Sequence, residues 1–119
     1  MRLTFVEAPW FSRRIRLRLN DDVYRKLQND LLNDPLKGAM MPGCGGLRKM
    51  RFADPSRNMG KRGGLRIVYL YTPQAFRIDL IDVYGKDEKD DLSQAQKKTL
   101  ARFAAAARQE AIDAYVAGR

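Results

Sequence analysis

Residues 42–71 read PGCGGLRKMRFADPSRNMGKRGGLRIVYLY, two apolar runs joined by a polar segment rich in glycine. Residues 47–53 and 65–72 have the composition of β-strands, whereas the segment between them carries the proline and glycines of a loop. Seven Lys or Arg side chains lie between Leu47 and Arg66, against a single acid, Asp54. The stretch therefore predicts two strands and a basic connecting loop that present positive charge to a polyanion.

The length and composition of the chain indicate one folded domain spanning residues 1–119, because 45% of the side chains are hydrophobic and the length suits a single core. The net charge is +9, and acids gather instead at residues 87–91. Such an uneven positive field favours nucleic acid, an anionic membrane or an acidic protein as partner. An ordinary basic surface that serves solubility is the simplest alternative.

Two residue types narrow the chemistry. The chain has no histidine and one cysteine, Cys44, so neither a histidine-based triad, a zinc site nor an internal disulfide is expected. We expect no metal or cofactor. The short N-terminal segment MRLTFVEAPWF lacks the features of a signal peptide, and no membrane span is visible. These features predict a cytoplasmic protein without a membrane partner.

The N-terminal third predicts a strand followed by two helices. Residues 3–6 form a short strand, and Pro9 suits the first turn of a helix. The next segment, WFSRRIRLRL, fits both helical spacing and strand alternation, and we predict a helix. A second amphipathic helix begins after the N-cap Asn20 and ends by residue 33, because Asp34 precedes Pro35. The two helices should form an antiparallel pair laid on a sheet.

The remainder predicts three strands and a long helix. Residues 36–46 are expected to be loop, and strands cover residues 47–53, 65–72 and 76–84. Ser93 and Gln96 form a capping box before a helix that extends to about residue 117. The order is βααβββα, an α+β fold with a mainly antiparallel sheet, a helical pair and a long C-terminal helix.

Alternation sorts the cations of residues 47–53 by face. Met50 and Phe52 point to the core, so Lys49 and Arg51 share the other, exposed face. Arg48 has the opposite parity and is interpreted as structural. Arg66 stands on the strand expected beside this one. Tyr84 and Lys86 lie at the end of the last strand.

Such a cluster is able to act on RNA without a metal. RNA supplies its own nucleophile, the ribose 2′-OH, and cleavage needs a proton acceptor, cations that stabilise the phosphorane, and a proton donor for the leaving 5′ oxygen. Lysine, arginine and tyrosine are able to fill these roles, because nearby cations favour the neutral form of a lysine. The plain alternative is a set of ordinary exposed side chains on a mixed sheet.

Other features of the sequence are weaker indications of function. Tyr69 and Tyr71 are more often core or edge residues than base-stacking groups, and Cys44 is interpreted as incidental. The Gly43-x-Gly45-Gly46 string does not predict a nucleotide loop, because it opens a strand, whereas a phosphate-binding glycine loop opens a helix.

Several spaced motifs together resemble one family. PGxGGLRKMR at residues 42–51, GKRGGxRIVY at 60–69, VYGKDE at 83–88 and DLS at 91–93 resemble the HigB-type branch of the RelE/ParE toxin superfamily. The resemblance runs from about residue 3 to 110 and agrees with the βααβββα order. It implies the toxin of a type II toxin–antitoxin pair. Such a toxin cleaves mRNA on the translating ribosome and is neutralised by a helix-turn-helix antitoxin of the HigA type.

The resemblance also suggests roles. Lys49 would be the general base, Arg51 and Arg66 would stabilise the transition state, and Tyr84 or Lys86 would donate the proton. Contacts to RNA or the ribosome would come from five further cations, which are Arg57, Lys61, Arg62, Arg13 and Arg14. Asp87 stands where some relatives carry another arginine, and histidine-using relatives also exist. The alternative is a non-catalytic protein of the same fold, such as a ParE-like inhibitor of DNA gyrase.

Overall fold

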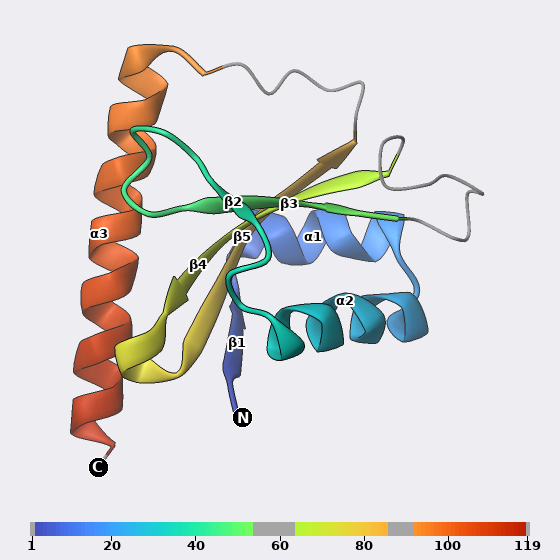
Figure 1. The fold of residues 1–119 in the computed structure, drawn as a ribbon, viewed down its shortest axis with the longest axis horizontal. Helices are drawn as coiled ribbons and strands as arrows, with labels where there is room; N and C mark the ends of the chain where they lie inside the picture. Colours follow the sequence, from blue (N-terminus) through green and yellow to red (C-terminus); the bar gives the residue numbers. More distant parts are fainter. Residues whose placement is uncertain (1, 54–63, 86–91, 119) are drawn as a thin grey trace.

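The fold is built on a mixed sheet with helices on both faces, as the computed structural model shows for residues 2–53, 64–85 and 92–118 (Figure 1). The elements in chain order are β1 (Thr4–Glu7), α1 (Pro9–Arg18), α2 (Asp21–Asn33), β2 (Ala39–Met40), β3 (Arg48–Phe52), β4 (Leu65–Thr72), the 3-10 turn η2 (Pro73–Ala75), β5 (Arg77–Gly85) and α3 (Gln94–Ala117). The predicted α+β class, with its helical pair and long C-terminal helix, is confirmed.

The sheet has the strand order β1-β5-β4-β3-β2. β1 pairs with β5 in parallel, and the other neighbours are antiparallel. One prediction was wrong: residues 36–46 are not all loop, because Ala39 and Met40 form the edge strand β2 opposite Lys49 and Arg48. A strand of two residues leaves no alternation to detect, and it exists through its pairing with β3.

Two hydrophobic clusters occupy the two faces of the sheet. On one face, Phe11 and Ile15 of α1 and Leu27 and Leu31 of α2 pack against β3, β4 and β5. In Figure 1 these two helices run in opposite directions on the same side of the sheet, as the sequence predicts. On the other face, Ala104 of α3 packs with the sheet and with residues of the loop before β3. The alanine side of α3 therefore covers the protein's own sheet.

Local signals explain where the helices begin. The Asn20 side chain accepts a hydrogen bond from the Val23 N–H at 2.9 Å, and Ser93 and Gln96 form the predicted capping box before α3. In α1 the helical spacing of Phe11 and Ile15 prevails over the alternating pattern. Leu17, which alternation would bury beside Ile15, is 83% exposed.

Tyr69 of β4 fixes the segment that leads into β2. Its buried hydroxyl donates to the Pro35 carbonyl at 2.8 Å and accepts from the Gly38 N–H at 2.8 Å. Burial raises the pKa of Tyr69, so the hydroxyl keeps its proton. Arg48, opposite Tyr69 in the sheet, donates to the Gly38 carbonyl at 2.7 Å. The predicted structural role of Arg48 and core role of Tyr69 agree with these contacts.

Replacing Tyr69 with Phe should destabilise the fold by about 1–3 kcal/mol, because a buried N–H and a buried carbonyl would each lose their partner. Urea unfolding of the wild type and variant measures this difference. Tyr71→Phe is the matched control, since the half-buried Tyr71 hydroxyl has no hydrogen bond within the described part of the chain. Equal midpoints for the two variants would contradict this role of the hydroxyl.

Candidate active site

Three of the predicted site residues lie in one row across the sheet. Arg51 of β3 is directly opposite Arg66 of β4, and Arg66 is directly opposite Tyr84 of β5. Opposite residues share a face, with Cβ atoms about 4.5–5.5 Å apart. The row belongs to the same face of the sheet as α3, because Tyr84 lies in the cluster that contains Ala104, but Figure 1 shows this end of β3, β4 and β5 at the far end of the sheet from the body of α3. We call these three residues the basic row.

A β-bulge places Tyr84 in the basic row. The register shifts between Val68 and Tyr69, whose partners are Asp82 and Leu80, so Ile81 is the extra residue of β5. Leu80 and Val83 consequently face α1 and α2, whereas Ile81 and Tyr84 face the other way. Strict alternation from Leu80 would have put Tyr84 on the face opposite to Arg66. Bulges commonly redirect side chains in this manner near active sites.

The row combines one exposed cation with two nearly buried groups. Arg51 is exposed, whereas Arg66 is 8% and Tyr84 9% exposed. The Arg66 guanidinium donates from Nη1 to the Gly64 carbonyl at 3.3 Å. Lys49 precedes Arg51 by two residues on β3, on the same face, and is half-buried. The predicted parity of β3 is confirmed, because Met50 and Phe52 lie in the cluster beneath α1 and α2.

The remaining predicted residues are dispersed. Arg13 and Arg14 lie exposed on α1, and Arg14 forms an ion pair with Asp82 of β5 at 2.7 Å. The charge of Arg14 is therefore partly neutralised by Asp82 within the protein. The other predicted cations lie outside the described residues, and these are Arg57, Lys61, Arg62 and Lys86. Sequence reasoning missed Lys97 of α3, which shares a cleft with Lys49.

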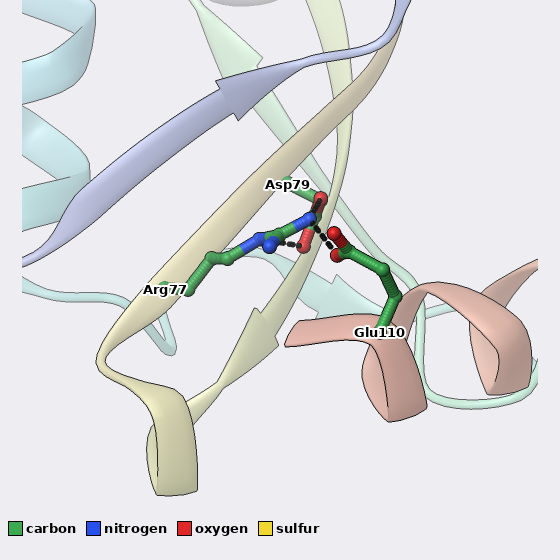
Figure 2. Close-up of polar contacts among 3 residues, drawn as sticks. All are labelled: Arg77, Asp79 and Glu110. Carbon is green, nitrogen blue, oxygen red and sulfur yellow. Dashed lines mark hydrogen bonds and ion pairs between the residues drawn. The ribbon is translucent and has the colours of Figure 1, made fainter. Parts of the chain in front are cut away.

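Sequence reasoning also missed a cluster of three charges that joins β5 to α3, shown in Figure 2. Arg77 donates to both oxygens of Asp79, at 2.9 and 3.2 Å, and forms an ion pair with Glu110 at 2.6 Å. Burial raises the pKa of Asp79, and its interaction with Arg77 offsets only part of that effect. Strand spacing explains why Arg77 and Asp79 share a face, but no local signal connects them to Glu110.

Removing the cation of this cluster should reduce the free energy of unfolding more than removing its exposed acid does. Arg77→Met leaves the carboxylate of Asp79, which is 8% exposed, without its partner, and the expected loss is about 3–5 kcal/mol. Glu110→Gln removes a carboxylate that is 62% exposed, so the expected loss is about 0–1 kcal/mol. Thermal unfolding at neutral pH measures both. Similar losses would contradict the burial argument.

The raised pKa of Asp79 also fixes the sign of a pH effect. Because its folded pKa lies above the ordinary value of 3.8, the folded state binds this proton more readily than the unfolded state. The resulting stability is present at acid pH and is lost as pH rises through the folded pKa. Acidification towards pH 3.8 should therefore raise the stability of the wild type relative to Asp79→Asn. A relative decrease, measured by unfolding at several pH values, would contradict this.

No protein-family model matches the chain. Within the described ranges, no group of three or more His, Cys, Asp or Glu side chains could hold a metal ion. The helices of the same ranges are too short or too polar to cross a bilayer. The basic row, with Lys49 beside it, is thus the most concentrated set of predicted site residues that the described structure brings together.

Proposed function

We propose that this protein is the toxin of a type II toxin–antitoxin pair and a ribosome-dependent mRNA endonuclease. The observation that carries the proposal is the basic row, in which Arg51, Arg66 and Tyr84 occupy adjacent strands. Two guanidinium groups on one face suit the oxygens of a phosphate, since arginine's planar fork matches that geometry. The motifs that resemble HigB-type toxins supply the reaction class.

The proposed reaction is an internal transesterification. The ribose 2′ oxygen attacks the adjacent phosphorus while the bond from phosphorus to the 5′ oxygen breaks, leaving a 2′,3′-cyclic phosphate and a 5′-hydroxyl. Lys49 accepts the 2′ proton, and this role requires an unprotonated amine. Arg51 and Arg66 stabilise the charge on the phosphorane.

The proton for the leaving 5′ oxygen comes from Tyr84 or Lys86. Tyr84 shares the row with Arg66, so it lies on the correct face for that task. Lys86 follows the last described residue of β5. In this proposal the ribosome supplies the mRNA, and a HigA-type helix-turn-helix antitoxin is the neutralising partner.

Arg51→Gln should reduce mRNA cleavage by about 10²-fold or more, because it removes one stabilising cation from the transition state. The measurement is a map of transcript 5′ ends after induction of the protein in growing cells. Cuts within translated codons are expected for the wild type. Arg66→Ala should abolish these cuts, with circular dichroism showing that the change at this nearly buried position has not unfolded the chain.

Arg25→Gln is the control for charge, since Arg25 is an exposed cation of α2, on the face opposite to the row. It should cleave like the wild type. Intact mRNA accompanied by DNA breaks would overturn the nuclease proposal and favour a gyrase inhibitor of the same fold. Equal loss in Arg51→Gln and Arg25→Gln would instead mean that net charge, not the row, matters.

A further inference from the structure

A cleft of about 340 Å³ is lined by Lys49, the lysine beside the basic row. It lies between the edge of the sheet, the loop before β3 and the start of α3. Its volume is near the lower end of the range of about 300–1,000 Å³ typical of small-molecule sites. The described residues that matter most in its lining are four apolar side chains and two lysines, namely Met40, Met41, Pro42, Leu92, Lys49 and Lys97.

Glycines bring α3 close enough to form one wall. Gly45 has φ +72°, and a Cβ there would lie 2.9 Å from the Ala101 backbone, so the loop sits directly on the helix. Gly43 has φ +73°, and a Cβ there would lie 3.5 Å from Cδ of Lys97. The methylene stem of Lys97 therefore rests against this loop, while its side chain lines the cleft.

The charge of the cleft favours an anion. Among the described residues that line it, two are lysines and none is acidic. The N-terminal end of α3 is already capped by its own side chains, because Ser93 accepts from the Gln96 N–H and Gln96 accepts from the Ser93 N–H. Because the proposed reaction requires an unprotonated Lys49, Lys97 supplies the positive charge that lines the cleft.

The apolar wall suits a flat aromatic group. Met40 belongs to the edge strand β2 and is 54% exposed, and it lines the cleft together with Met41 and Pro42. Thioether sulfur makes favourable contacts with aromatic rings and adapts its shape to them. A ligand with an aromatic ring and a nearby negative charge, such as a nucleotide, matches both parts of this cleft.

Lys49 connects the cleft with the basic row. Lys49 lines the cleft and stands two residues from Arg51 on the same face of β3, a separation of about 6.6 Å along a strand. A single RNA strand whose phosphate is held by the row could therefore place a neighbouring nucleotide in the cleft.

We propose that this cleft is a nucleotide subsite for single-stranded RNA. The base lies against Met40, Met41 and Pro42, and the phosphate of the same nucleotide contacts Lys97. The inference rests on the proposed function and identifies where the nucleotide next to the cleaved phosphate is held. No bond is made or broken in the cleft.

The first test compares two adjacent lysines of α3. Lys97 lines the cleft, whereas the exposed Lys98 does not, so Lys97→Met and Lys98→Met change the net charge equally. The probe is a short 2′-O-methylated RNA oligonucleotide, which cannot be cleaved through its 2′ oxygen, titrated into the full-length protein. Lys97→Met should weaken binding about tenfold and lower the slope of log affinity against log salt by about 0.7. Lys98→Met should change affinity less than about twofold.

The second test examines the base. An oligonucleotide with an abasic position is compared with the intact one, and the wild type should prefer the intact strand. Met40→Ala should remove this preference, while Leu36→Ala should keep it, since Leu36 is a similarly exposed apolar residue outside the cleft lining. Both positions are exposed, so neither truncation opens a cavity in the core.

Three results would overturn the subsite: equal effects of Lys97→Met and Lys98→Met, equal affinity of the wild type for intact and abasic strands, or no binding of the oligonucleotide at all. Each of these three results can be distinguished from a failure of the proposed function. If mRNA stays intact in cells while the contrast between Lys97 and Lys98 persists, the nuclease proposal fails and the cleft is supported as an RNA-binding subsite.

Discussion

The burial of β4 on both faces constrains the rest of the structure. Ile67 and Tyr69 pack beneath α1 and α2, and Val68 and Leu70 pack on the side of α3. A strand covered on both faces cannot slip by one residue without reversing every contact, so its register is strongly specified. Arg66 shares the parity of Val68 and is only 8% exposed. The same packing that fixes the register of β4 therefore also fixes Arg66 opposite Arg51 and Tyr84.

Alternation alone could not predict which side chains of β5 share a face, because the strand contains a bulge. Ile78, Leu80 and Val83 all belong to the cluster beneath α1 and α2, with spacings of two and then three. A sequence of apolar residues at both parities gives no indication of which one is extra. Only the pairing of Leu80 with Tyr69 and of Asp82 with Val68 identifies Ile81. Tyr84 was thus a candidate from its motif, while its place beside Arg66 depends on tertiary structure.

The features that could be predicted depend on near neighbours in the chain. The alternation of β3, the cap at Asn20 and the capping box at Ser93 all involve residues within a few positions of one another. The features that were missed depend on distant residues. The segment that leads into β2 is held by two hydrogen bonds with Tyr69, one accepted and one donated, across more than 30 residues. The cleft requires Lys97 to approach Gly43. The local preferences of the sequence contain no information about either of these contacts between distant residues.

The basic row places two cations opposite each other on neighbouring strands. Like charges directly opposite on neighbouring strands destabilise a sheet, and Arg51 stands opposite Arg66. A sheet selected only for stability would place an acid or an apolar residue at one of these positions, because either would remove the repulsion. A bound phosphate would also remove it, and anything that binds the folded state alone adds to its stability. The pairing of Arg51 with Arg66 places two guanidinium groups where one anion could contact both, an arrangement that the net charge of the chain does not by itself imply.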